Sequence, residues 1–147
     1  GPGYEWDPVI RNNSLLQSQI PVRLVWGEQY NKACCGAKIV LCFFSKLNRD
    51  TYTRRCFEIP ATGTLLLSEY SDDLAGMYQE GVEAEYFRSK EELLEKIKYY
   101  LDNDKIRKSV SIAGLQRVRK DAHDVVSRMK QVLDWAGKIY AEEAPLC

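Results

Sequence analysis

Two acidic and two basic side chains stand close together in the segment 50–63, and their types suit the binding of a phosphorylated sugar. Asp50 and Glu58 are eight positions apart, so on a helix both carboxylates lie near one face. A carboxylate accepts two hydrogen bonds from the paired hydroxyls of a ribose or sugar ring. Arg54 and Arg55 add cations that suit phosphate oxygens. The same spacing also fits a solvated helix face with surface ion pairs.

Short apolar runs separated by helical segments must position these side chains, and they predict an α/β fold. The run Lys38–Phe44 is apolar almost throughout, which is typical of a strand buried on both faces of a parallel sheet. Pro60 and Gly63 are expected to end the preceding helix before the next strand. We expect strands at 8–10, 22–26, 38–44, 64–68 and 84–87, with helices at 14–20, 50–59 and 71–78.

The second half of the chain is predicted to be helical. Ser89 and Glu92 form a capping box, and apolar residues then recur at helical spacing through Leu101. Two more helices follow, one after Asn103 and one over 122–140. The predicted fold is a Rossmann-like parallel sheet of about four or five strands, flanked by helices and with a helical C-terminal end. Such sheets bind ligands outside the carboxyl ends of their strands, which directs attention to 11–14, 45–58 and 68–73.

Composition narrows the function classes. The 147 residues allow one ordinary domain, expected over 4–147, with 1–3 as a tag remnant. Twenty-one basic and twenty-one acidic residues cancel, which gives no electrostatic argument for nucleic-acid binding. The longest apolar stretch, 39–44, is far too short for a membrane span. Five cysteines without paired metal-ligand spacing, and a single histidine, argue against a metal site and favour a reducing, cytoplasmic location.

Several motifs resemble one enzyme family in their order along the chain. Arg55–Gly63 resembles the R-x-F-E-x-x-A-x-G signature of group 1 glycosyltransferases, and the spore-maturation-type branch is the most similar. Phe87–Leu93 resembles the family's helix start f-x-s-x-E-E-L. Ile112–Val118, followed by His123 and Arg128, resembles its C-terminal tail.

The resemblance implies a function and assigns roles to residues. Family members have the GT-B fold, two Rossmann-like domains around a cleft, and this chain resembles the C-terminal half, which binds the nucleotide-sugar donor. The implied partners are a nucleoside-diphosphate sugar and an N-terminal acceptor domain, with no metal and no cofactor besides the donor. Glu58 matches the carboxylate that binds the donor ribose, and Asp50 stands where a second carboxylate contacts the transferred sugar. The expected substrate-binding residues are Arg55, Arg54, Lys46, Arg11, Asn48, Thr53 and Gly63.

Two alternatives remain open at this stage. A non-catalytic Rossmann-like interaction domain would keep the fold and lose the transfer chemistry. A flavodoxin-like or receiver-like module is a weaker alternative, because a receiver needs acidic residues after its first strand and only Asp7 is near. A lone histidine such as His123 is more often a surface or packing residue than a catalytic one.

Overall fold

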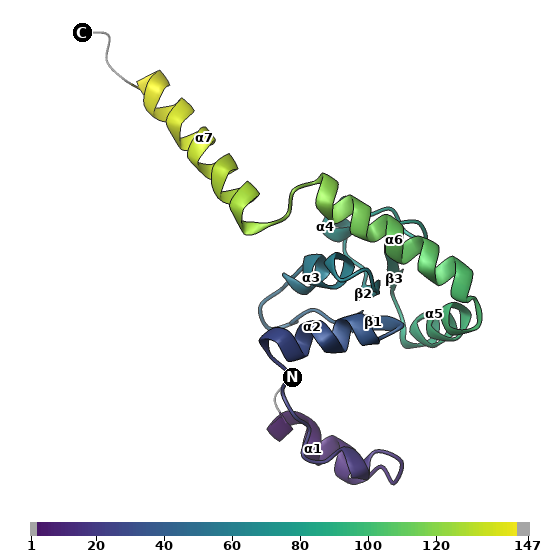
Figure 1. Cartoon of the computed structure of the whole chain (residues 1–147). Coiled ribbons are helices and arrows are strands. Elements are labelled where there is room, and N and C mark those ends of the chain that lie inside the picture. The colour runs from purple at the N-terminus through teal and green to yellow at the C-terminus, as the bar shows by residue number, and fades with distance from the viewer. Residues whose placement is uncertain (1–2, 144–147) are drawn as a thin grey trace. The chain divides into compact units, whose positions relative to one another are not determined.

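A computed structural model describes residues 3–143 of the chain (Figure 1). The chain divides after Gly36 into two compact units, residues 1–36 and 37–147. Each unit is described by itself below.

The first unit contains helices and loops in its described part. Helix α1 spans Gly3–Arg11, a 3-10 helix η1 spans Gln17–Gln19, and α2 spans Gly27–Gly36. The prediction of a strand at 8–10 is wrong, because these residues lie inside α1. Of the helix predicted over 14–20, only the 3-10 helix η1 forms. The alternating segment 22–26 forms no regular structure. A strand needs a ladder partner for its backbone groups, and the described residues of this unit contain no second strand.

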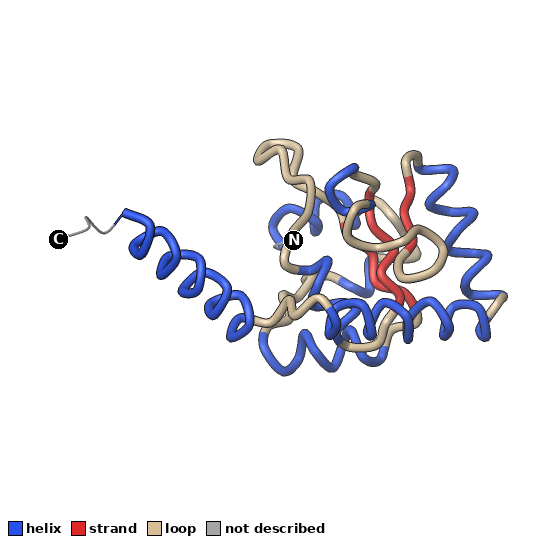
Figure 2. Tube along the Cα trace, turned by 90° about the horizontal axis from the view of Figure 1, so that it is seen from above, coloured by secondary structure: helices blue, strands red, loops and turns tan. Residues whose placement is uncertain are grey.

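The second unit is built on a parallel sheet. Its strands are β1 (Ile39–Cys42), β2 (Leu65–Glu69) and β3 (Glu85–Phe87), in the order β1-β2-β3. Ile39 pairs with Leu65, and Leu67 pairs with Glu85. The prediction of a parallel α/β sheet is confirmed, but the described residues form three strands rather than four or five. Figure 2 shows the strands side by side with helices around them.

Helices cover both faces of this sheet. Helix α5 (Lys90–Asp102) lies on one face, where Leu65 packs with Tyr100 and with Val110 of the next helix. Helix α3 (Arg55–Ala61) lies on the other face, because Cys56 contacts Cys42 there. The short helix α4 (Asp72–Ala75) follows β2 and begins at Ser71, whose hydroxyl accepts the Leu74 N–H. The predicted capping box is formed in part, since the Ser89 hydroxyl caps α5.

Ion pairs bridge β3 and α5 beneath one face of the sheet. Glu85, 6% exposed, accepts a hydrogen bond from Tyr100 Oη at 2.5 Å and an ion pair from Lys96 Nζ at 2.9 Å. Lys96 also lies 3.1 Å from Glu80 and 2.9 Å from Glu92. Burial alone would lower the pKa of Lys96, but the surrounding carboxylates outweigh it and raise that pKa. The buried charge of Glu85 is therefore paired with the Lys96 cation and hydrogen-bonded to the Tyr100 hydroxyl.

Helix α6 (Asp104–Lys120) packs against α3 and β2. At Gly114 it touches the chain just before β3, so closely that a Cβ there would lie 2.3 Å from the carbonyl oxygen of Glu83 and 3.6 Å from Cβ of Pro60. This contact lies before the amino ends of β2 and β3, whereas ligands of parallel sheets bind outside the carboxyl ends of the strands.

This close approach gives a stability prediction. We expect Gly114→Ala to lower the free energy of unfolding by roughly 1–3 kcal/mol, because the new methyl group overlaps a backbone oxygen. Gly137→Ala is the matched control, since a Cβ there meets nothing within 4 Å and helix propensity favours alanine. Thermal melts of both variants test the difference. A Gly114→Ala protein at least as stable as the parent would contradict the packing described here.

The last described helix, α7, spans Val125–Glu143. It carries a set of exposed large apolar side chains, among them Val125, Val126, Met129, Val132, Leu133 and Trp135. None of the helices described in residues 3–143 is long and apolar enough to cross a membrane.

Candidate functional site

The candidate site is the loop 43–54 at the carboxyl edge of the sheet. This loop leaves β1 at its last residue, Cys42, and leads into α3. Within it, the Asp50 N–H donates to the Ser45 carbonyl at 3.1 Å, which closes a tight turn. Arg49 inside this turn has φ +55°, a left-handed conformation. The loop thus places its polar side chains beside the ends of β1 and β2.

Residues that follow β2 hold this loop in place. Glu69 Oε2 accepts the N–H of Phe44 at 3.1 Å, and Glu69 Oε1 pairs with Lys46. The Ser71 hydroxyl donates to the carbonyl of Thr51. Partial burial alone would raise the pKa of Glu69, but the hydrogen bonds from Lys46 and Phe44 outweigh it and lower that pKa. Glu69 is therefore a charged anchor for the loop.

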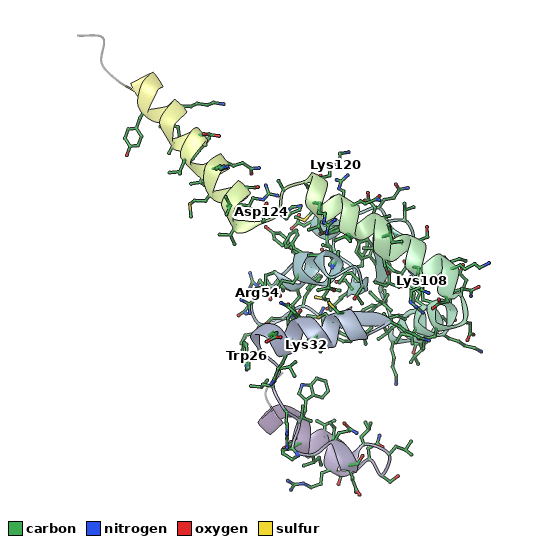
Figure 3. The ribbon with its side chains drawn as sticks, in the orientation of Figure 1. Trp26, Lys32, Arg54, Lys108, Lys120 and Asp124 are labelled. Atoms are coloured by element: carbon green, nitrogen blue, oxygen red, sulfur yellow. The ribbon has the colours of Figure 1, made fainter. Side chains whose placement is uncertain are left out.

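Glu58 lies in the first turn of α3, at the end of the candidate loop. Its side chain is 40% exposed, and its Oε1 lies 3.6 Å from Nε of Arg54, the residue that precedes the helix. Figure 3 labels Arg54 near the start of α3. The Glu58 carboxylate is thus neither packed in the interior nor placed at the amino edge. It has a free surface and one neighbouring cation, which suits the binding of hydroxyl groups.

The expected helix over 50–59 starts later than predicted. Helix α3 begins at Arg55, and Asp50 lies in the turn before it. The prediction that Asp50 and Glu58 share one helix face is therefore wrong. Pro60 does not end the helix either, since it lies inside α3, which continues to Ala61. Both carboxylates still come from the stretch between β1 and the first turn of α3.

The structure shows other contacts for the remaining predicted loop residues. The Arg55 Nη2 donates to the carbonyl of Phe43 at 3.1 Å, so Arg55 braces the start of the loop. Lys46 pairs with Glu69 while its side chain stays 81% exposed. The N–H of Asn48 donates to the Ser45 hydroxyl at 3.2 Å. Thr53 Oγ1 lies 3.8 Å from the Cys42 sulfur, on the inner side of the loop.

Two predicted residues lie outside the candidate loop 43–54. Gly63 lies after α3 and before β2, with φ +75° and Leu115 near it, so its role in the structure is to turn the chain. Arg11 ends α1 in the first unit, where its carbonyl accepts a hydrogen bond from Gln17. A shallow groove of about 280 Å³ also lies away from the predicted residues, on the α5 side of β1. It is lined by Lys38, Ile39, Leu41, Ile97 and Leu101.

The histidine of the sequence motif lies against α3. The ring of His123 stacks on that of Phe57, with centroids 4.4 Å apart, and its Nδ1 lies 2.6 Å from Nη2 of Arg128. The two motif residues His123 and Arg128 therefore contact each other. Phe57 precedes Glu58 in α3, so the histidine supports the helix that carries the candidate carboxylate. Burial lowers the pKa of His123, and the charge of Arg128 lowers it further.

This environment predicts a pH dependence. Because the pKa of His123 in the folded state lies below its ordinary value of about 6.5, the stabilising contribution of the neutral ring is complete above about pH 6.5. It is lost as the pH falls through the folded-state pKa, because the charged ring is disfavoured in the fold. Since the chain has one histidine, its ring resonances can be followed by NMR titration without ambiguity. We expect Arg128→Gln to move this pKa upward, and a parent value of 6.5 or more would refute the assignment.

Sequence reasoning missed Glu69 and the cation–π contact beside it. The guanidinium of Arg88, directly after β3, lies 4.0 Å from the ring centroid of Tyr70. Glu69 and Tyr70 belong to the stretch 68–73, which the strand-end rule had singled out without naming a residue. The position of Glu69 at the end of a buried apolar strand was the feature of the sequence that could have identified it.

Comparison with known proteins gives one family match. A family model described as "Glycosyl transferase-like" matches residues 1–134, which is most of the chain. Neither the search of curated proteins nor that of solved structures gave a match. Among the residues that the structure describes, no group of three or more histidine, cysteine, aspartate or glutamate side chains is arranged to hold a metal ion.

Proposed function

Since the chain belongs to the glycosyl transferase-like family, we propose that it is the donor-binding half of a glycosyltransferase. The complete enzyme would have a GT-B-type fold, of which this chain is one Rossmann-like half. Its substrate would be a nucleoside-diphosphate sugar, from which the complete enzyme transfers the sugar to an acceptor. Family membership supports the transferase class. The observation that carries the proposal is the partly exposed Glu58 carboxylate, which lies beside Arg54 at the carboxyl edge of a parallel sheet.

The residues at this edge suit the chemistry of glycosyl transfer. When the glycosidic bond of the donor breaks, negative charge builds on the diphosphate oxygens of the leaving group, and nearby cations stabilise it. Arg54 and Lys46 have side chains that are 77% and 81% exposed, so they can turn toward a ligand. Glu58 would accept hydrogen bonds from the ribose hydroxyls and orient the donor. Asp50, in the turn of the same loop, is proposed to contact the transferred sugar.

One observation favours a second candidate function, a non-catalytic interaction domain. The three candidate cations between 46 and 55 already have partners in the structure, since Arg54 pairs with Glu58, Lys46 pairs with Glu69, and Arg55 binds the Phe43 carbonyl. A donor diphosphate must therefore compete with these contacts. Exposed ion pairs are weak, at about 0–1 kcal/mol, so a doubly charged ligand is expected to displace them.

A ligand titration tests the proposal. The full chain is titrated separately with UDP-, GDP-, dTDP- and ADP-sugars while backbone amide shifts are recorded. We expect one of these donors to shift amides within 45–75, with those of α7 as the internal reference. If none of the four donors moves an amide in that range at millimolar concentration, the donor-binding function is wrong and the non-catalytic alternative stands.

A further inference from the structure

Two thiols face each other beneath the candidate loop. The Sγ of Cys42, at the end of β1, lies 3.8 Å from the Sγ of Cys56, in the first turn of α3. Both cysteines are free and 0% exposed. A disulfide bond is about 2.0 Å long, so a closing movement of roughly 2 Å would join the two sulfurs.

We propose that Cys42 and Cys56 are a redox modification site, in which a hydroperoxide converts the two thiols into an intramolecular disulfide that ties α3 to β1. The bond would close the intervening segment 43–55 into a covalent loop. This inference stands apart from the donor-binding function, because it depends only on the thiol pair and the loop that covers it.

The chemistry proceeds in two displacements. The sulfur of Cys42 attacks one oxygen of the hydroperoxide, the O–O bond breaks, and the other oxygen leaves as an alcohol or water after taking up a proton. Cys42 is then a sulfenic acid. The sulfur of Cys56 attacks the Cys42 sulfur, the S–O bond breaks, and hydroxide leaves as water with the proton of Cys56. In total, the two thiols lose two protons and two electrons, and one hydroperoxide is reduced to an alcohol or water with release of one water.

The surroundings of the two sulfurs assign these roles. A hydrogen bond from Cys56 lowers the pKa of the Cys42 thiol, and the charge of Arg55 lowers it further against the effect of burial. The same hydrogen bond, together with burial, raises the pKa of Cys56. Thiolates are the nucleophilic form of cysteine, so Cys42 is the attacking residue and Cys56 the resolving one. Thr53, on the inner side of the loop, approaches the Cys42 sulfur as well.

Access to the thiols depends on opening of the loop. Every residue from 45 to 54 is exposed or only half-buried, and Leu47 is 93% exposed. The loop is fastened mainly by polar contacts, such as those of Arg55 with Phe43 and of Ser71 with Thr51. Segments with few buried apolar contacts open at low free-energy cost. Oxidation is therefore expected to be slower than at the exposed Cys35 and to follow loop opening.

A thiol count tests the proposal. In a Cys34→Ser, Cys35→Ser, Cys147→Ser background, two thiols remain, and hydrogen peroxide is expected to reduce the count under denaturing conditions from two to none. A dithiol reductant should restore both. Mass spectrometry should show loss of two hydrogens and a tryptic cross-link between the peptides that contain Cys42 and Cys56. Adding Cys56→Ser to the background should leave Cys42 without its partner and abolish the intramolecular link.

The unmodified chain provides a second measurement that does not depend on the folding of the variants. Its peptides are mapped after peroxide treatment that is extended well beyond the time at which Cys35 is fully oxidised. The Cys42–Cys56 link, together with slower tryptic cleavage after Lys46 and Arg49, supports the proposal. Persistence of both thiols, oxidation of Cys42 to a sulfinic acid, or links to other cysteines in place of this one would overturn it.

Discussion

Replacing Glu58 with alanine is expected to weaken donor binding about 100-fold. The carboxylate is proposed to accept two ribose hydroxyl hydrogen bonds, and bonds to a charged group contribute about 1.5–3 kcal/mol each. A loss of about 3 kcal/mol, the low end of that sum, corresponds to roughly two powers of ten in the dissociation constant. Calorimetric or NMR titration with the donor that binds the parent chain measures the change.

Two further variants separate the charge of Glu58 from the stability of the fold. Glu58→Gln keeps the length of the side chain and removes its charge, so we expect a smaller loss of affinity. Glu95→Ala, at an exposed position of α5, is the matched control and should bind as the parent does. If Glu58→Ala binds the donor within twofold of the parent while its melting temperature is unchanged, Glu58 is not a donor ligand.

The second large effect is expected at Lys96. Replacing Lys96 with methionine keeps most of the apolar volume and removes the cation that lies 2.9 Å from the buried Glu85. An uncompensated buried charge costs about 3–5 kcal/mol. We expect a loss of stability of this size, measured by urea unfolding at pH 7. Lys98→Met, at an exposed position of the same helix, should change the stability little.

A double-mutant cycle checks the cause of the Lys96 effect. Neutralising the carboxylate by Glu85→Gln should cost less in the Lys96→Met background than in the parent, because the unpaired charge is removed. Independent, additive effects of the two substitutions would show that the ion pair does not stabilise the fold. Acid provides a further check at Glu80, where hydrogen bonds from Arg88 lower the pKa to about 2. The contribution of Glu80 is complete above about pH 4.5 and is lost as the pH falls toward 2.

The sequence predicted those elements that have one dominant local signal. The apolar runs around Val40 and Leu66 form parallel strands, and the serine cap at Ser89 starts a helix where expected. In these segments the local preference and the packing agree. The predicted burial on both faces is found for residues 65–68 of β2 but is wrong for β1, which is only partly buried and whose Leu41 is 37% exposed. A strand buried on both faces is typical of a parallel sheet covered by helices, so the apolar run of β2 also predicted the fold class.

Elements that depend on a distant partner were not predictable in the same way. The segment 22–26 alternates like a strand, but no strand among the described residues pairs with it. Helix α3 begins at Arg55 and not at the predicted Asp50. Asp50 instead closes a turn that starts at Ser45 and contains the left-handed Arg49. Periodicity cannot show such a turn, since it is stabilised by backbone hydrogen bonds rather than by a pattern of apolar side chains.

For the candidate site, the sequence predicted which segment follows the carboxyl end of β1, but it did not predict the contacts within that segment. Glu58 and Arg54 lie together as the spacing implied. Arg55, expected near phosphate, instead braces the Phe43 carbonyl, and Glu69 was not singled out although it fastens the loop. A side chain's partner depends on which loops the fold brings together, and this information is not local to the chain.

The central position of β2 has a consequence for measurements on this protein. Residues 65–68 are buried, and the strand has a neighbour on each side. Their amide hydrogens therefore exchange with solvent only when the second unit unfolds as a whole, whereas those of residues 46–52 exchange whenever the loop lifts. Deuterium uptake at the two places reports global stability and local opening separately in a single sample. A ligand that binds only the closed loop would slow uptake at both places by the same factor, whereas a ligand bound elsewhere on the second unit would slow uptake at β2 and leave the loop unchanged.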